Sequence, residues 1–222
     1  MHALETPLRQ GLAQLQLTLD DTQVAHLLGY LDLIQKWTRV YNLTAVREPQ
    51  EMLTHHLLDS LAVIAPLRRQ LAALPLAALA PVEVRLLDVG SGAGLPGAVI
   101  AICCPDITVH CVDTVAKKAA FVQQVAVALR LPNLRGLHAR VENLAETYQV
   151  VSSRAFASLA DFSAWSGGAL AEHGIWMAMK GKHPDAEIAA LPPQVQVFHV
   201  EPLAVPGLDA ERCIVWMRAS AA

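Results

Sequence analysis

The chain has 222 residues, of which 54% are hydrophobic and 17% are charged, and its formal net charge is −3 with a pI near 6.3. This length suits one α/β domain with an added segment, or two small domains, and the hydrophobic fraction argues against disorder. The mildly acidic balance excludes a general attraction to nucleic acid, so an RNA partner would need a local basic surface.

Nothing in the sequence predicts a membrane or export segment. The longest apolar run, residues 71–82, contains two prolines and is too short to span a bilayer. The first residues lack the basic cluster and apolar stretch of an export signal. The cysteines have no CxxC spacing, and we expect them to be reduced and buried in a cytoplasmic protein: Cys103, Cys104, Cys111 and Cys213.

The first part of the chain predicts a helical segment, residues 1–80, ahead of the main domain, residues 81–222. Asp21 or Thr22 can cap a helix whose apolar residues recur at three- and four-residue spacing. After a loop, a second long helix is expected from Pro49 to Pro66.

In the main domain, strands and helices alternate, which is typical of a parallel sheet covered on both faces. The expected strands are 84–89, 108–112, 134–138, 150–153, 174–180, 195–200 and 212–218, and the last two form a closing antiparallel pair. The expected helices are 98–104, 115–131 and 158–172. We therefore predict an α/β fold with a mainly parallel, seven-stranded, Rossmann-like sheet.

The most informative stretch reads VRLLDVGSGAGLPG, where an apolar strand leads into a loop with four glycines: Gly90, Gly92, Gly94 and Gly97. Such a loop lets the backbone turn tightly and approach a ligand closely. Its spacing fits the G-x-G-x-x-G pattern of dinucleotide sites, and an ordinary turn is the simpler alternative. Asp88 ahead of the first glycine resembles instead the first motif of class I methyltransferases, which bind S-adenosylmethionine.

Two acidic residues follow the next two strands. Asp113 ends the second strand, where an acid binds the ribose hydroxyls of a nucleoside, although it could also cap the following helix. Glu142, with Val141, follows the third strand, where adenine would lie. Alone, Glu142 would be an ordinary surface glutamate. We predict a ribose contact for Asp113 and an adenine contact for Glu142.

Basic residues end the fourth and fifth strands. Arg154 could hold a methionine carboxylate or a guanine, or it could pair with a surface carboxylate. Lys180 is expected on the same side, within reach of phosphate. His56 and Asp59 lie on one helix face next to His55 and could be metal ligands. No further candidate ligand has the sequence spacing of a metal site. We expect a polar cluster or a cleft there, and no metal site.

Two absences narrow the chemistry. The fourth strand is followed by Ser-Arg-Ala-Phe, which differs from the Asn/Asp-Pro-Pro-aromatic motif of amino-group methyltransferases, and no Pro-Cys dipeptide supplies a cytosine C5 nucleophile. An acceptor that is already nucleophilic, such as a ring nitrogen lone pair, needs neither device. It needs alignment with the methyl donor.

Together with their flanking segments, these motifs resemble the bacterial ribosomal RNA small subunit methyltransferase G family, also called glucose-inhibited division protein B. The resemblance covers nearly the whole chain. It rests on Tyr41-Asn42-Leu43-Thr44, Glu51-Met52, His56-Leu57-Leu58-Asp59-Ser60, the stretch from Asp88 to Gly97, Lys117-Lys118 with Phe121, Arg140-Val141-Glu142, the stretch from Ser153 to Leu159, and Lys180-Gly181. One departure is Ala93, at a position where relatives can carry proline.

The resemblance implies a class I S-adenosylmethionine-dependent methyltransferase fold and methylation at N7 of a guanine in the decoding-region loop of 16S ribosomal RNA. The expected cofactor contacts are Asp88, Gly90, Gly92, Gly94, Leu95, Asp113, Val141, Glu142 and Arg154. Arg154 is expected to position the reactants without a general base. The expected substrate contacts are Asn42, His56, Arg140 and Lys180.

The expected partner is 16S ribosomal RNA or the assembling small subunit, with no membrane and no DNA, and the chain is expected to be a monomer. Two other functions stay open at this point. One is a small-molecule methyltransferase with a helical lid, which the acidic pI favours. The other is a nucleotide-binding module of the NAD type without catalysis.

Overall fold

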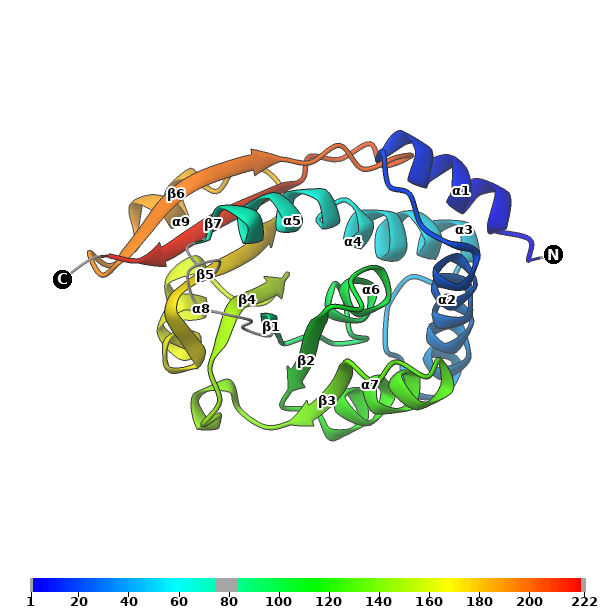
Figure 1. Cartoon of the computed structure of the whole chain (residues 1–222), viewed down its shortest axis with the longest axis horizontal. Coiled ribbons are helices and arrows are strands. Elements are labelled where there is room, and N and C mark those ends of the chain that lie inside the picture. The colour runs from blue at the N-terminus through cyan, green and yellow to red at the C-terminus, as the bar shows by residue number, and fades with distance from the viewer. Residues whose placement is uncertain (1, 75–83, 221–222) are drawn as a thin grey trace.

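The computed structural model describes residues 2–74 and 84–220 (Figure 1). The N-terminal part is helical, as predicted, and comprises α1 (Glu5–Gln14), α2 (Asp21–Tyr41), α3 (Pro49–Met52), the π-helix η1 (Leu53–Leu58), α4 (Asp59–Leu61) and α5 (Ile64–Ala73). The strands are β1 (Val84–Val89), β2 (Ile107–Asp113), β3 (Leu134–His138), β4 (Tyr148–Arg154), β5 (Leu170–Lys180), β6 (Val195–Pro202) and β7 (Cys213–Ala219). The helices among them are α6 (Gly97–Cys103), α7 (Ala116–Ala128), η3 (Val141–Asn143), α8 (Leu159–Ser166), η4 (Gly167–Ala169) and α9 (Asp185–Ala189).

Seven strands form one sheet in the order β3-β2-β1-β4-β5-β7-β6. The neighbours among β1 to β5 pair in parallel, whereas β7 runs antiparallel to both β5 and β6. The predicted mainly parallel α/β sheet with a closing antiparallel pair is confirmed. Strand order reverses at β1, and sheets of this kind bind ligands at the carboxyl ends of the strands beside that point.

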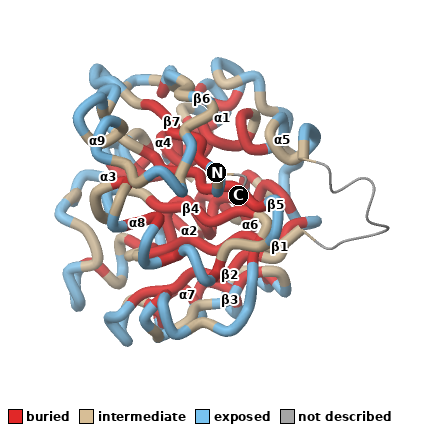
Figure 2. The backbone as a smooth tube through the Cα atoms, turned by 90° about the vertical axis from the view of Figure 1, so that its left-hand side faces the viewer, coloured by how far each residue is buried: buried red, intermediate tan, exposed pale blue. Residues whose placement is uncertain are grey.

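Alternation of side chains along the strands builds a core on each face of the sheet. In β1, Leu86 belongs to one hydrophobic cluster and Leu87 to the other, because successive side chains point to opposite faces. Residues of α2, α6 and α7 complete the first cluster, and residues of α8 complete the second. Figure 2 shows the buried residues concentrated along the strands and the inner sides of these helices.

The N-terminal segment is anchored on the face of the sheet that carries α6 and α7. α2 packs on both helices, and α4 packs on α6. Asp20 and Gln23 form a capping box at the start of α2, and Gln23 also donates to the carbonyl of Ile102 at 3.0 Å. The predicted cap at Asp21 or Thr22 is therefore one or two residues too late. The predicted domain division near residue 80 lies outside the described residues and stays a prediction.

The prediction that a helix stops at Pro66 is wrong. A turn at Ala62-Val63 separates α4 from α5, which then runs through Pro66 to Ala73. Pro66 lies in the first turn of α5, where a backbone N–H has no partner within the helix to lose.

The prediction of a helix over 158–172 is also wrong at its C-terminal end. α8 stops at Ser166, where Gly167-Gly168 follows, and β5 begins at Leu170 rather than at Gly174. Leu170 pairs with Tyr148 before the register shifts, so the start of β5 is a tertiary pairing across a bulge. The short helix α9 had no counterpart among the predicted elements.

Candidate active site

A pocket of about 510 Å³ opens at the carboxyl ends of β1 and β2. Five predicted site residues line it: Gly90, Asp113, Arg140, Val141 and Glu142. The other predicted site residues lie outside this lining: Asp88, Gly92, Gly94, Leu95, Arg154, Asn42, His56 and Lys180. The pocket therefore contains the residues predicted to contact the nucleoside part of the cofactor. The residues predicted to contact the substrate are spread over several elements.

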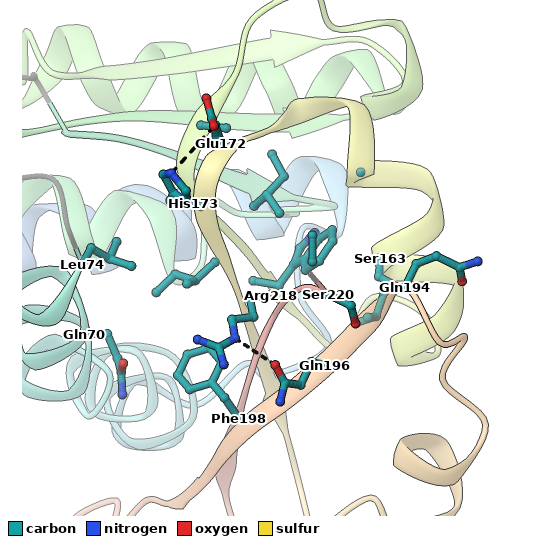
Figure 3. Close-up of a pocket in the computed structure, with 18 of the residues that line it drawn as sticks. Gln70, Leu74, Ser163, Glu172, His173, Gln194, Gln196, Phe198, Arg218 and Ser220 are labelled. Atoms are coloured by element: carbon teal, nitrogen blue, oxygen red, sulfur yellow. Dashed lines mark hydrogen bonds and ion pairs between the residues drawn. The ribbon is translucent and has the colours of Figure 1, made fainter. Parts of the chain in front are cut away.

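A larger cavity, of about 1300 Å³, lies at the amino-terminal end of β5 (Figure 3). Its polar side chains pair with one another: His173 lies 3.7 Å from Glu172, and Arg218 donates to Gln196 at 3.0 Å. This cavity lies at the amino-terminal edge of the parallel strands, opposite the carboxyl-terminal edge where the glycine loop lies. We therefore place the active site at the smaller pocket.

The glycine loop takes a backbone path that favours glycine. Gly90, Gly92 and Gly94 have φ angles of +63°, +59° and +84°. A Cβ at Gly90 would lie 2.3 Å from the ring of Phe156, whereas a Cβ at Gly92 would meet no atom within 4 Å. The buried Leu95 side chain packs in the core, so a ligand contact at this residue would use its backbone. The surface over Gly92 is therefore open to a ligand.

Asp88 is fully buried behind this loop. Its carboxylate accepts hydrogen bonds from the backbone N–H of Gly97 at 3.0 Å and from the Ser152 hydroxyl at 2.9 Å. Burial raises the pKa of Asp88 to about 6, against the opposing effect of these two donors. In this geometry Asp88 fixes the start of α6 against β1, and its influence on a ligand would pass through the loop.

Asp113 ends β2 and faces the glycine loop. One carboxylate oxygen accepts from the backbone N–H of Gly92 at 3.1 Å, and the other accepts from that of Val115 at 2.8 Å. Lys118 lies 3.7 Å away. The bond to Val115 is a contact of the kind that the helix-capping alternative predicted. Asp113 also lines the pocket.

The far wall of the pocket follows β3. Val141 is buried, whereas Arg140 and Glu142 are exposed beside it. Phe156 and Trp165 also line the pocket and pack edge to face with ring centres 5.8 Å apart. The lining thus includes an exposed carboxylate and a pair of aromatic rings.

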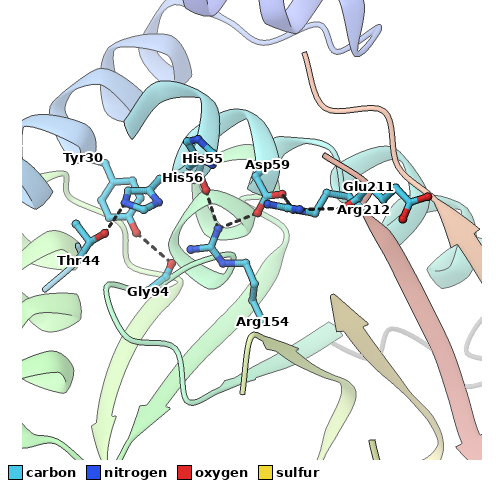
Figure 4. A network of polar contacts seen from close by, with 9 residues as sticks. All are labelled: Tyr30, Thr44, His55, His56, Asp59, Gly94, Arg154, Glu211 and Arg212. Carbon is cyan, nitrogen blue, oxygen red and sulfur yellow. Dashed lines mark hydrogen bonds and ion pairs between the residues drawn. The ribbon is translucent and has the colours of Figure 1, made fainter. Parts of the chain in front are cut away.

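Arg154 is held by the N-terminal segment (Figure 4). Its Nη1 donates to the carboxylate of Asp59 at 2.8 Å and to the carbonyl of His55 at 3.0 Å. The other oxygen of Asp59 accepts from Nε of Arg212 at 2.9 Å. The side chain of Asp59 is 3% exposed, so it is a nearly buried carboxylate shared by two arginines. Arg154 therefore pairs with a carboxylate, that of Asp59, as the alternative interpretation of this residue predicted.

His56 and Asn42 form local contacts beside this network. Nε2 of His56 lies 2.9 Å from the Thr44 hydroxyl, and burial, followed by the charge of Arg154, lowers the pKa of His56 to about 4. Asn42 follows α2 in a left-handed conformation and accepts from Arg47 at 2.7 Å. His56 is therefore a neutral, buried side chain at neutral pH.

Lys180 ends β5 and is occupied by internal contacts. Its ammonium donates to the carbonyl of Ala157 at 2.9 Å and to Glu187 at 2.8 Å. Glu187 also accepts from the backbone N–H of Leu159. In this geometry Lys180 fixes the loop between β4 and α8, and a phosphate contact would have to compete with these bonds.

Sequence reasoning missed Tyr30, which supports the glycine loop from beneath. Its hydroxyl donates to the carbonyl of Ala93 at 2.6 Å and lies 3.2 Å from that of Gly94, and the side chain is fully buried. Tyr30 occupies an ordinary apolar position of α2, so no local pattern could have revealed this contact. The roles of Arg212 and Glu187 were missed for the same reason.

The pocket fits S-adenosylmethionine. The Asp113 carboxylate at the end of β2 and the exposed Glu142 after β3 provide acceptors in the order in which such sheets meet ribose and base. The open space over Gly92 leaves room for the ligand to approach the loop backbone. The described residues therefore supply what a bound nucleoside requires.

No helix in ranges 2–74 and 84–220 is long and apolar enough to cross a membrane. Within the same ranges, no group of three or more His, Cys, Asp or Glu side chains could hold a metal ion. His56 and Asp59 are instead engaged in the contacts described above. All four cysteines are free and buried, as expected.

Two solved structures share this fold. TrmN from Thermus thermophilus matches with a TM-score of 0.54 and 19% identity, over 76% of this chain and 53% of that chain. Coclaurine N-methyltransferase, bound to N-methylheliamine and S-adenosylhomocysteine, matches with a TM-score of 0.53 and 12% identity, over 90% of this chain and 73% of that chain. At these identities the likeness shows the fold, which is that of class I S-adenosylmethionine-dependent methyltransferases.

Sequence comparison is more specific. The family model described as rRNA small subunit methyltransferase G matches residues 23–215. The protein named ribosomal RNA small subunit methyltransferase G from Albidiferax ferrireducens is 69% identical over the full length of both chains. The protein of the same name from Polaromonas sp. strain JS666 is 67% identical over 100% of this chain and 96% of its own length. This chain therefore belongs to the rRNA small subunit methyltransferase G family.

Proposed function

We propose that this protein transfers the methyl group of S-adenosylmethionine to N7 of a guanine in the decoding-region loop of 16S ribosomal RNA. The observation that carries the proposal is the full-length match to relatives named ribosomal RNA small subunit methyltransferase G. The pocket at the ends of β1 and β2 supports it, because its residues suit the nucleoside part of the methyl donor.

S-adenosylmethionine would supply an electrophilic methyl group, and the chain would bind and orient it. Asp113 would accept hydrogen bonds from the ribose hydroxyls, while Glu142 and the segment at Val141 would contact adenine. The loop backbone around Gly90 and Gly92 would face the methionine part. Asp88 would support this loop through Gly97.

Arg154 would orient one of the reactants. Asp59 and the carbonyl of His55 bind its Nη1, which fixes the guanidinium. Its Nε and Nη2 make no hydrogen bond with any residue of the described ranges. These N–H groups remain for a methionine carboxylate, or for O6 and N7 of a guanine.

The reaction needs no base from the protein. Guanine N7 carries an in-plane lone pair and has no proton to lose. His56 has a pKa lowered to about 4 and lies against Thr44, and Asp59 is paired with two arginines. His56 is thus a weak base and the carboxylate of Asp59 is already bound, so the chain would act by aligning the lone pair with the methyl group.

The proposed partner is 16S ribosomal RNA or the assembling small subunit, met by a monomer in the cytoplasm, with neither DNA nor a membrane involved. Among the predicted substrate residues, the exposed Arg140 lies at the pocket rim. Asn42, His56 and Lys180 would act mainly by fixing the loops around the site, because their side chains already have internal partners.

The test is nucleoside mapping of 16S ribosomal RNA from a strain that lacks the gene. One 7-methylguanosine should disappear, and purified protein with S-adenosylmethionine should restore it on the unmethylated RNA. An unchanged set of modified nucleosides overturns the proposal. Calorimetry with S-adenosylmethionine and with NAD then separates a small-molecule methyltransferase, which binds the former, from an NAD-type module.

A further inference from the structure

A surface at the end of α2 combines an exposed aromatic ring with a lysine and has no part in the cofactor pocket. Tyr41 is the last residue of α2 and is 45% exposed. The ammonium of Lys117, in the first turn of α7, lies 5.3 Å from the centre of its ring. We call Tyr41 and Lys117 the platform.

The ring of Tyr41 is held from below by a series of aromatic contacts. Its centre lies 5.1 Å from that of Trp37, which packs edge to face on the buried Phe121 at 5.2 Å. Phe121 stacks in turn on Tyr30, whose hydroxyl binds the glycine loop. The exposed ring is therefore already immobilised, so a ligand that stacks on it would lose little additional side-chain entropy.

Lys117 of the platform is adjacent in sequence to Lys118, which lines the pocket. Lys118 lines the pocket and lies 3.7 Å from Asp113, whereas Lys117 lies over Tyr41. Lys117 forms no ion pair with a carboxylate of the described residues. Its charge is thus available to an anionic ligand that binds beside Tyr41.

We propose that Tyr41 and Lys117 bind a nucleotide of the substrate RNA next to the methylated guanine, with the Lys117 ammonium moving from the Tyr41 ring to the phosphate while the base stacks on the ring in its place. This inference rests on the proposed function. Bases of unpaired RNA stack on exposed aromatic side chains, and lysines contact the backbone beside them. The net charge of −3 provides no general attraction to RNA, so a stacking contact would carry more of the affinity.

The experiment measures binding of small ribosomal subunits, and of their extracted 16S RNA, from a strain that lacks the methylation. Tyr41→Ala should raise the dissociation constant roughly five- to a hundredfold, because one base loses its stacking partner. Tyr41→Phe keeps the ring and should bind like the wild type. Val40→Ala is the matched control, since Val40 is the adjacent residue and is 69% exposed. Lys117→Gln should reduce the slope of log affinity against log salt by about one.

Calorimetry with S-adenosylmethionine keeps the two proposals apart. Tyr41→Ala should retain the cofactor affinity of the wild type, which shows that the pocket is intact. Equal RNA affinities of Tyr41→Ala and the wild type overturn the platform. Failure of the wild-type protein to methylate the RNA overturns the proposed function instead, and this is seen before any variant is compared.

Photo-cross-linking of the wild-type complex provides a measurement that does not depend on a variant. Trypsin cleaves after arginine, so it should cut after Arg39 and after Arg47 and release residues 40–47 as one peptide. We expect this peptide to carry the cross-linked nucleotide. Its absence from the cross-linked fraction, with other peptides present, contradicts the platform.

Discussion

The glycine corner and the arginine network beside it are assembled in different ways. The corner joins Gly92 to Asp113, residues at the ends of adjacent parallel strands. The network joins Asp59 to Arg154 and Arg212, which are 95 and 153 positions away in the chain. The corner is a local motif that any such sheet can present, whereas the network exists only once the N-terminal helices have docked.

The N-terminal segment therefore contacts residues of the proposed site directly. Asp59 orients Arg154 at the end of β4, and Tyr30 supports the loop at Ala93 and Gly94. Loss of a corner residue should therefore affect ligand binding, whereas loss of a network residue should first affect stability. The following predictions test this contrast.

The largest effect is expected from Asp59→Ala. It would leave Arg154 and Arg212 without their shared carboxylate in a site where both are largely buried. Removing one partner of a buried ion pair costs about 3 to 5 kcal/mol of unfolding free energy, which urea denaturation would measure. Arg9→Ala, which breaks the exposed ion pairs of Arg9 with Glu5 and Asp21, is the control and should leave the urea midpoint unchanged. A midpoint unchanged in Asp59→Ala would refute the structural role of the network.

The same contrast separates the features that the sequence could predict from those that it could not. The boundaries of β1 and β3 and the mainly parallel sheet were predictable, because they depend on apolar runs, glycines and alternation. The pairing of Leu170 with Tyr148, which starts β5 early, was not, because it is a contact between distant segments. The pocket residues Asp113 and Glu142 were found from their positions after strands, whereas Tyr30 has no local signal.

The second effect concerns stability as a function of pH. The pKa of His56 is lowered from 6.5 to about 4, so the folded state binds this proton less readily than the unfolded state. The free energy of unfolding should therefore fall as pH drops from 6.5 toward 4, by about 3 kcal/mol for the full shift. Urea denaturation of the wild type and His56→Gln between pH 7 and 4 measures this difference.

Asp88 should act in the opposite direction over nearly the same range. Burial raises its pKa from 3.8 to about 6, so its contribution to stability is lost as pH rises through 6. The two effects oppose each other in the wild type, and the variants separate them. His56→Gln should be less sensitive to acid than the wild type, and Asp88→Asn more sensitive. Parallel curves for all three proteins would contradict both pKa shifts.

The third prediction tests the corner. Asp113→Ala should weaken S-adenosylmethionine by about 1.5 to 3 kcal/mol, because a charge-assisted contact to the ribose is lost. That corresponds to roughly a ten- to hundredfold higher dissociation constant in calorimetry. If a folded Asp113→Ala variant bound the cofactor with unchanged affinity, Asp113 would serve only its backbone contacts to Gly92 and Val115.

A smaller effect is expected where the two regions meet. Tyr30→Phe keeps the buried ring but removes the hydrogen bond to Ala93, at a cost of about 1 kcal/mol in stability. Because this bond supports the glycine loop, S-adenosylmethionine should also bind several-fold more weakly. Tyr148→Phe is the matched control, since Tyr148 is equally buried and its hydroxyl bonds His110 away from the loop. Equal cofactor affinities of the two variants would rule out a positioning role for Tyr30.

The last prediction is the absence of an effect, and it concerns the chemical step. Loss of an obligatory general base typically costs 10²–10⁴-fold in rate, and such a base titrates in the rate profile. Guanine N7 needs no base, and His56, with a pKa of about 4, stays neutral from pH 6 to 9. Single-turnover methylation at saturating RNA and cofactor should therefore be independent of pH across this range. His56→Ala should change the rate little, whereas Arg154→Ala should slow it most, because it loosens the alignment of the reactants. A steep ionisation that vanished in His56→Ala would instead identify an acceptor that must lose a proton, and the network would then supply chemistry as well as alignment.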